Sequence, residues 1–238
     1  MSPDPSPPAS HEIALLLLQG NLKISKGTEI NFAENAYIAV NGSLTIIGDK
    51  DELIKLSSIK DSWKGVFVYN SKNKSILNNT LIENVHYTND GILNLTGGIS
   101  FYNTLVKINN LKIINSFSED ALNIINSNFE IDNLEIFQTA SDAVDFDYSN
   151  GYVRNSKFHN IGGDAIDFSG SEAMINNVFI EGIDDKGISV GENSNIKIYN
   201  STVNNANIGI VSKDGSITLL NESSVNNSNL YSIMSYVK

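Results

Sequence analysis

A repeat of 22 residues constrains the fold of this chain more than any other feature. The sequence can be divided into segments, called lines below, that begin at Asp120, Asp142, Asp164, Lys186 and Ile208. These lines align without gaps, and each begins 22 residues after the one before. The lines open with DALNI, DAVDF, DAIDF, KGISV and IGIVS. A fixed period of this length indicates stacked structural units, each of which covers its neighbour.

Within each line the first residues follow a period of two. The third place is always apolar: Leu122, Val144, Ile166, Ile188 and Ile210. The fifth place is apolar in four lines: Ile124, Phe146, Phe168 and Val190. This alternation predicts a strand whose third and fifth residues face the core and whose second and fourth residues face outward.

An asparagine recurs later in each line, with a spacing close to that of the repeat: Asn110, Asn133, Asn155, Asn177, Asn200 and Asn221. Asparagine tolerates the left-handed backbone of a sharp bend and bonds to a neighbour above it, so the column predicts a stacked turn. Three short strands and no helical period in each unit predict an all-β fold. We therefore expect a right-handed parallel β-helix, a solenoid of about 22 residues per coil.

The repeat also divides the chain. All four prolines lie within residues 1–10, which we expect to form a disordered leader. Residues 11–97 are expected to form an N-terminal cap and irregular coils, and residues 98–238 regular coils, within one continuous domain, 11–238. The last line stops in mid-coil, which predicts that the chain is part of a larger protein and that the coil end can associate end to end with another copy.

Composition narrows the classes of partner. The formal net charge is −11 and Arg154 is the single arginine, which argues against a nucleic-acid partner. The chain has no cysteine, so disulfides, thiolate metal sites and cysteine nucleophiles are excluded. The apolar run at residues 13–18 is far shorter than a bilayer span, and we expect no membrane insertion.

The segments SEDALNI, SDAVDFDYSNG and GGDAIDFSGS resemble the right-handed parallel β-helix proteins of the pectin-lyase-like superfamily. They also resemble β-helix modules attached to spore-coat-H-type kinase-like proteins of bacteria. The resemblance implies an extracellular or cell-envelope setting and the handling of polysaccharides by lyases, hydrolases or epimerases, or a role as a spacer, adhesin or binding module. The His-Gly and Arg-Ile-Lys motifs of polygalacturonases are missing. The lyases place an Arg or Lys base near a calcium-binding carboxylate cluster, and only half of that arrangement is visible in this sequence. The polygalacturonase mechanism is not carried over.

The fourth place of the lines carries the candidate site. Asn123, Asp145, Asp167 and Ser189 are expected to form a polar ladder on the outside of one sheet. Coils about 4.8 Å apart would bring the carboxylates of Asp145 and Asp167 close together, and Asp147 lies two residues further along the same face. Like charges at that distance require either a raised pKa or a bound cation.

Three interpretations of this ladder stay open. Asp145, Asp147 and Asp167 are candidate ligands of Ca²⁺, with Asn123, Ser189 and Lys186 as further ligand-contacting residues. Alternatively, Asp145 and Asp167 are the paired carboxylates of a glycosidase, at the short separation of a retaining enzyme. The third interpretation is a solvated acidic surface.

A second column, Asp120, Asp142 and Asp164, opens the strands directly after a turn. Because aspartate often accepts backbone N–H bonds at turns, we expect structural bracing there, with Lys186 neutralising the last carboxylate. The leading functional hypothesis is a non-catalytic β-helix scaffold or binding module of a larger bacterial surface protein. In it the acidic ladder binds carbohydrate or Ca²⁺, and the alternative is a polysaccharide-active enzyme.

Overall fold

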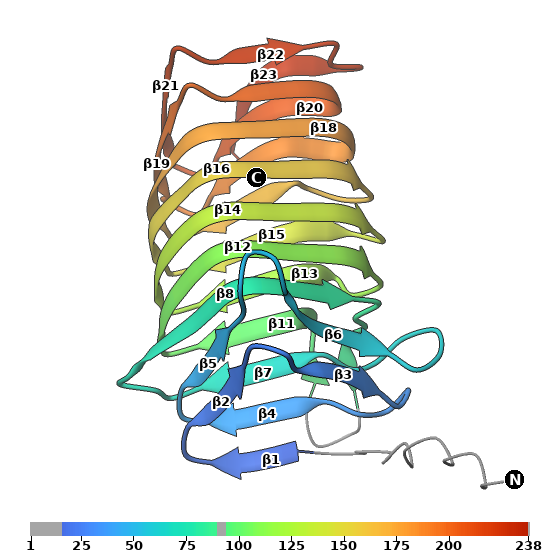
Figure 1. Ribbon diagram of the computed structural model, residues 1–238. Coiled ribbons are helices and arrows are strands. Elements are labelled where there is room, and N and C mark those ends of the chain that lie inside the picture. The colour runs from blue at the N-terminus through green and yellow to red at the C-terminus, as the bar shows by residue number, and fades with distance from the viewer. Residues whose placement is uncertain (1–15, 90–93, 238) are drawn as a thin grey trace, which may run out of the picture.

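The chain winds into a stack of β-coils in the computed structural model, which describes residues 16–89 and 94–237 (Figure 1). Pairing between coils is parallel, and no described residue is helical. Successive coils advance from the blue N-terminal end to the red C-terminal end. The predicted all-β parallel β-helix is thus confirmed, whereas the expected leader, residues 1–10, lies outside the described residues.

The strands stack into three parallel faces. The first, called the acidic sheet below, contains β1 (Leu16–Gln19), β4 (Ile38–Asn41), β7 (Val66–Tyr69), β11 (Gly97–Tyr102), β13 (Asp120–Ile125), β15 (Asp142–Asp147), β17 (Ile166–Ser169), the end of β18 (Glu172–Gly191), the end of β20 (Thr202–Lys213) and β23 (Tyr231–Tyr236).

The second sheet contains β2 (Leu22–Ser25), β5 (Leu44–Ile47), the starts of β8 (Lys74–Glu83), β12 (Leu105–Ser116), β14 (Asn128–Thr139), β16 (Asn150–Ile161) and β18, then β19 (Asn195–Tyr199) and β21 (Ile217–Asn221). The third contains β3 (Glu29–Phe32), β6 (Ile54–Ser58), the ends of β8, β12, β14 and β16, the middle of β18, the start of β20, and β22 (Ser224–Asn226). A short antiparallel pair, β9 (Thr88–Asn89) and β10 (Asn94–Leu95), stands apart.

The spacing between coils is regular only in the second half of the chain. Ile38 pairs with Val66 and Val66 pairs with Ile99, so consecutive coils there are 28 and 33 residues apart. From Leu122 onward the partners in the acidic sheet lie 22 residues apart as far as Ile210. The extra residues of the early coils lie in the connections between strands.

The core confirms most of the predicted alternation, with one correction. Leu122, Ile124 and their counterparts in the next coils are fully buried. The second place was expected to face outward, and this was wrong, because Ala121, Ala143 and Ala165 are fully buried in the core. A Cβ added at Gly187, the same place in the next coil, would meet the Val203 side chain. Second and third places both point inward here, so only small residues fit at the second.

The predicted asparagine turn is confirmed in five of the six coils; in the last one the prediction of Asn221 was wrong, because Glu222 has the left-handed backbone and Asn221 pairs with Tyr199. Asn110, Asn133, Asn155 and Asn177 have φ of 53–56°, in the left-handed region. The Asn133 amide donates to Asn110 Oδ1 at 3.0 Å, and Asn177 donates to Asn155 Oδ1 at 2.7 Å. Asn155 and Asn200 donate instead to the residue before the turn asparagine of the neighbouring coil, Asp132 and Asn176. Side-chain bonds between coils thus follow this corner and help to fix the register of the stack.

A buried serine column braces another corner. Ser149 Oγ accepts the Ser127 N–H at 3.1 Å and donates to the Ile124 carbonyl at 2.9 Å, and Ser171 repeats the arrangement one coil later. The hydroxyls satisfy backbone N–H groups that would otherwise be buried without a partner at the bend.

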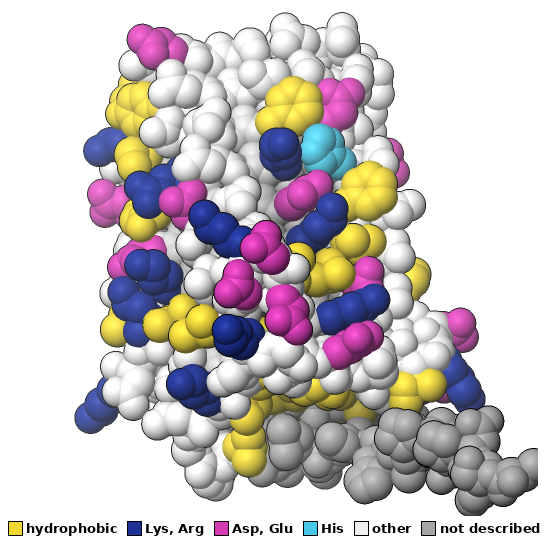
Figure 2. All heavy atoms as spheres, viewed as in Figure 1, with side chains coloured by type: hydrophobic (Ala, Val, Ile, Leu, Met, Phe, Trp, Pro, Cys, Tyr) yellow, Lys and Arg dark blue, Asp and Glu magenta, His cyan; other side chains and the backbone are white. Residues whose placement is uncertain are grey.

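The outer surface of β12, β14 and β16 has mixed charge. Figure 2 shows acidic and basic side chains interspersed over the middle coils of the face in view. Several form ion pairs between coils, among them Lys112 with Glu135 at 3.5 Å and Arg154 with Asp132 at 2.9 Å. These exposed pairs contribute little to stability but leave this surface near neutrality, unlike the acidic sheet. None of the described segments forms an apolar helix of membrane-spanning length.

Candidate functional site

Three columns of side chains run along the outside of the acidic sheet, parallel to the axis of the solenoid. The edge column is Asp120, Asp142, Asp164 and Lys186. The middle column is Asn123, Asp145, Asp167 and Ser189. The far column is Ile125, Asp147, Ser169 and Gly191. The register pairs each member of the middle column with the next, so the predicted ladder exists as a continuous row.

The edge column braces the turns, as expected. Asp142 Oδ1 accepts the Asp164 backbone N–H at 2.8 Å, and Asp164 Oδ1 accepts the Lys186 backbone N–H at 2.9 Å. Asp120 instead accepts from the Asn123 amide at 2.9 Å and from the Thr96 hydroxyl at 3.3 Å. Asp142 thereby keeps its second oxygen available beside the middle column, whereas both oxygens of Asp164 accept from the Lys186 ammonium, at 3.1 and 3.3 Å.

The middle column contains an unusual concentration of unpartnered oxygens. Asn123 Oδ1, Asp145 Oδ1, Asp167 Oδ1 and Ser189 Oγ are all buried, and none has a hydrogen-bond partner among the described residues. These are four of the eight such side-chain atoms in the described part of the chain. A buried polar atom without a partner costs about 1–3 kcal/mol, so a row of four calls for a ligand that supplies the missing interaction.

The two ends of the row differ. At the N-terminal end, a hollow of about 260 Å³ is lined by Leu95, Thr96, Tyr102 and Asn123, among others. At the C-terminal end, the side chain of Lys213, itself buried, packs against Gly191 on the same strand as Ser189. Asn123 and Ser189 are 4% and 0% exposed although they lie on the outer side of the sheet.

Burial and mutual repulsion raise the pKa of several carboxyls. Burial, followed by the charge of Asp147 and those of the edge and middle columns, raises the pKa of Asp145 from 3.8 to about 9. Burial also raises the pKa of Asp147, to which the charge of Asp167 adds. The predicted clash of like charges is therefore present, and it is centred on Asp145.

The edge carboxyls are perturbed less because each has a donor. Burial raises the pKa of Asp120 and of Asp142 to about 6, against the hydrogen bonds from Asn123 and from the Asp164 backbone. Burial raises the pKa of Asp164 to about 7 although Lys186 lowers it. Around neutral pH the face thus holds more carboxyl groups than it can ionise at low cost.

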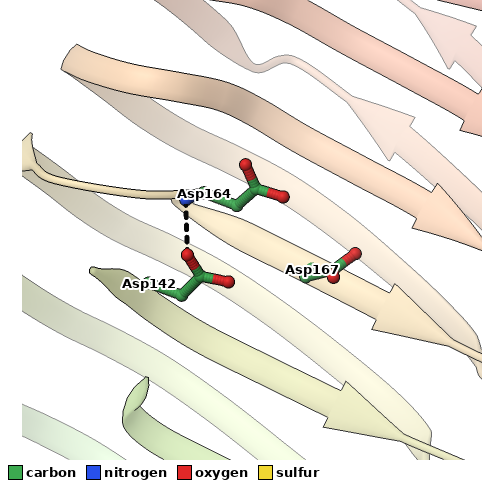
Figure 3. Close-up of side chains that lie close together, drawn as sticks. All are labelled: Asp142, Asp164 and Asp167. Atoms are coloured by element: carbon green, nitrogen blue, oxygen red, sulfur yellow. Dashed lines mark hydrogen bonds between the residues drawn. The ribbon is translucent and has the colours of Figure 1, made fainter. Parts of the chain in front are cut away.

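Three of the carboxylates converge. Each of Asp142, Asp164 and Asp167 offers one oxygen, and these oxygens lie within 4.8 Å of one another, in an arrangement suited to a metal ion (Figure 3). Asp142 and Asp164 come from the edge column of adjacent coils, and Asp167 lies beside them on β17. Ca²⁺ binds oxygen at about 2.3–2.6 Å, and small side-chain rotations would bring three oxygens this close onto a single ion.

Lys186 is the cation of the cluster. Its ammonium lies 3.1 Å from Asp164 Oδ1 and 2.6 Å from Asp185 Oδ2. Burial lowers the pKa of Lys186, but the hydrogen bond to Asp185 and the charge of Asp164 outweigh it and raise the pKa overall. One ammonium cannot balance the carboxylates of three columns, and Lys186 serves the C-terminal end of the row only.

The predicted and the observed groups overlap in part. Asp167 belongs both to the predicted Ca²⁺ ligands and to the converging trio, whereas Asp142 and Asp164 were interpreted from the sequence as braces alone. The position of these two residues at the start of a strand predicted the bracing hydrogen bonds. It gave no indication that their carboxyl groups also approach Asp167. The predicted roles of Asp145, Asp147, Asn123, Ser189 and Lys186 stay predictions.

Comparison with known proteins identifies the family. The model of the right handed beta helix region matches residues 97–237, more than half of the chain. The chain belongs to this family. A search of curated proteins found no match.

Solved structures with a similar path of the chain include carbohydrate-active proteins. The catalytic domain of a GH87 alpha-1,3-glucanase in complex with tetrasaccharides is 12% identical, with a TM-score of 0.43 over 100% of this chain and 70% of that one. The tailspike of Acinetobacter phage vb_AbaP_AS12 is 11% identical, with a TM-score of 0.37 over 94% and 57%. Endopolygalacturonase I from Stereum purpureum is 10% identical, with a TM-score of 0.32 over 94% and 95%. Likeness at this level carries no argument about what this chain binds.

Proposed function

We propose that this chain is a β-helix binding module of a larger bacterial surface protein, and that its acidic sheet binds Ca²⁺ and, through it, an acidic polysaccharide. The observation that carries the proposal is the row of four buried, unpartnered oxygens beside three converging carboxylates. A divalent cation supplies the charge and the coordination that these groups lack.

The ligands of the ion would be oxygens of Asp142, Asp164 and Asp167, with the Lys186 ammonium displaced from Asp164. Asp145 and Asp147 lie in adjacent positions that a flexible coordination shell can recruit. Ca²⁺ takes about six to eight oxygens and tolerates irregular geometry, whereas Mg²⁺ requires a near-ideal octahedron. A site formed by stacked coils therefore favours Ca²⁺. The coordination positions left open would take the carboxylate and hydroxyl oxygens of a uronic-acid polymer, and the far column is the side from which such a chain would approach.

The test is binding of a polyuronate in the presence and absence of Ca²⁺. Wild type should bind immobilised polygalacturonate or alginate with millimolar Ca²⁺ and release it when EDTA is added. Asp142→Asn/Asp167→Asn should bind neither polygalacturonate nor alginate, because two of the three converging carboxylates then lose their charge. Asp184→Asn, an exposed carboxylate of the same coils, is the matched control and should behave as wild type. Binding that ignores EDTA and the double substitution would refute the proposal.

A second candidate, glycoside hydrolysis, is favoured by one observation. The raised pKa of Asp145 keeps this carboxyl protonated at neutral pH, as a general acid requires, and Asp167 is its register neighbour. Release of reducing ends from a polysaccharide, abolished by Asp145→Asn, would establish this function. Binding without any release of reducing ends favours the binding module.

A further inference from the structure

A second hollow lies at the corner that follows the acidic sheet, and an interrupted amide ladder leads to it. Asn70, Asn103 and Asn126 occupy this corner in three coils, each with φ between 47° and 55°. The Asn103 amide donates to Asn70 Oδ1 at 3.3 Å, and the Asn126 amide donates to Asn103 Oδ1. In the next coil the equivalent residue is Tyr148, and the ladder stops.

Tyr148 keeps the left-handed backbone of the asparagines it replaces, with φ of 49°. An aromatic residue is a genuine outlier in this region, and such a conformation persists where the surroundings impose it and often where function retains it. The side chain does not compensate by burial, since the residue is 62% exposed. Fold stability alone gives no reason for a tyrosine at a corner where asparagine forms a ladder.

The ring of Tyr148 is held in place by the coil above. Gly170 occupies the corner there, and a Cβ added to it would lie 2.6 Å from Tyr148 Cδ1. Only glycine lets the ring pack this closely against the backbone. The result is an exposed aromatic surface with a fixed position.

Tyr148 borders a surface hollow of about 470 Å³, within the range of small-molecule sites. Its lining is rich in amides and hydroxyls, including Asn126, Asn128 and Asn150, and Lys72 supplies a positive charge. Because Tyr148 interrupts the ladder, Asn126 Oδ1 has no donor among the described residues. An aromatic surface, free amide groups and one cation are together suited to a sugar ring that bears hydroxyls and a carboxylate.

We propose that Tyr148 and this hollow form a subsite for an acidic oligosaccharide, separate from the cation site. The sugar stacks on the Tyr148 ring, its hydroxyls donate to Asn126 Oδ1, and its carboxylate pairs with Lys72. The inference rests on the saccharide-binding part of the proposed function but not on its cation. Since Asp147 directly precedes Tyr148, one polysaccharide can contact the acidic sheet and the corner together.

The experiment is titration calorimetry with three tetrasaccharides, of galacturonate, of mannuronate and of glucose (cellotetraose), in EDTA. The decisive variant is Tyr148→Asn, which restores the amide ladder and removes the ring. We expect a higher Tm than wild type, because the strain is relieved, together with affinity for the acidic probes at least about ten-fold lower. Tyr231→Asn, at another exposed tyrosine (54% exposed), is the matched control and should bind as wild type.

The outcomes separate the subsite from the cation site. Binding in EDTA that Tyr148→Asn weakens and Asp142→Asn/Asp167→Asn preserves supports the subsite, whether or not Ca²⁺ binds elsewhere. Equal affinity of wild type and Tyr148→Asn overturns it, as does the absence of binding by all three probes. Binding that requires Ca²⁺ and is unaffected by Tyr148→Asn also overturns the subsite while supporting the proposed function.

Discussion

Replacement of Asp145 by asparagine should stabilise the fold at neutral pH, and the size of the gain should depend on pH. The pKa of Asp145 is about 9 in the folded chain against 3.8 ordinarily, so folding takes up a proton at any pH between these values. Stability is therefore greatest below the ordinary pKa and is lost as the pH rises toward 9. Asparagine removes the titration and with it this loss.

The magnitude follows from linkage. Proton uptake costs about 1.4 kcal/mol for each pH unit above the ordinary pKa, which gives about 4 kcal/mol at pH 7. The new amide N–H groups must find partners in place of a carboxyl oxygen that has none, at a cost of about 1–3 kcal/mol. The net gain at pH 7 should be about 1–3 kcal/mol, or roughly 3–10 °C in Tm for a chain of this size.

The assay is thermal unfolding in EDTA, followed by circular dichroism, from pH 4 to pH 8.5. Wild type should lose stability across this range more steeply than Asp145→Asn. The two curves should cross at about pH 4.5–6, where the cost of proton uptake equals the cost of the new amide, and below that pH Asp145→Asn should be the less stable. Asp184→Asn, an exposed carboxylate, controls for the general effect of removing a negative charge. Parallel pH profiles for wild type and Asp145→Asn would show that Asp145 is ionised at little cost, and the reasoning would fail.

Four further predictions concern the surrounding groups and the pH dependence of the site. Lys186→Met should destabilise the metal-free chain by about 1–3 kcal/mol at pH 8 and less at pH 5, because Asp164, with a pKa of about 7, loses its cationic partner; urea unfolding measures this. The same variant should bind Ca²⁺ more tightly in calorimetry, since a competing cation is gone, and an unchanged affinity would place the ion elsewhere. Ser149→Ala should cost about 1–3 kcal/mol, because the Ser127 N–H is left buried without an acceptor; a loss no larger than that of the exposed Ser224→Ala would contradict the bracing role. Ca²⁺ affinity should rise between pH 5 and pH 8, because binding displaces protons from carboxyls of raised pKa, and a calorimetric titration at both pH values checks the direction.

The fold was predictable because the signals of a solenoid recur in the sequence itself. A column such as Leu122, Val144 and Ile166 repeats at the same interval as the coil, so period and register follow from alignment alone. The same register placed Asp145 beside Asp167. What alternation missed is the bend at the start of each strand, where Ala121 and Leu122 both turn inward. A bend of this kind interrupts the alternation of inward and outward side chains, and the spacing of apolar residues in the sequence does not indicate it.

The candidate site was predictable only in its outline. Serines at 127, 149, 171 and 194 repeat with the coil, yet serine is common at turns, and its buried bracing role emerges only from the hydrogen bonds. Ser189 is fully buried between coils, and its register partner in the next coil is the buried Val211. The convergence of Asp142 with Asp167 depends on which way each carboxylate turns after its backbone bond is made. Side-chain directions of this kind are set by packing in three dimensions.

The most direct test of the cation site is calorimetric titration of Ca²⁺ into the metal-free protein near pH 7.5, for wild type and Asp167→Asn. We expect one saturable site in wild type, with a Kd between about 10⁻⁵ and 10⁻³ M, and a Tm that rises with the Ca²⁺ concentration. Asp167→Asn should lose both the heat and the shift in Tm, and Asp184→Asn should retain them. No heat and no shift in Tm for wild type at millimolar Ca²⁺ would contradict the account and leave the acidic sheet as a strained surface with another purpose.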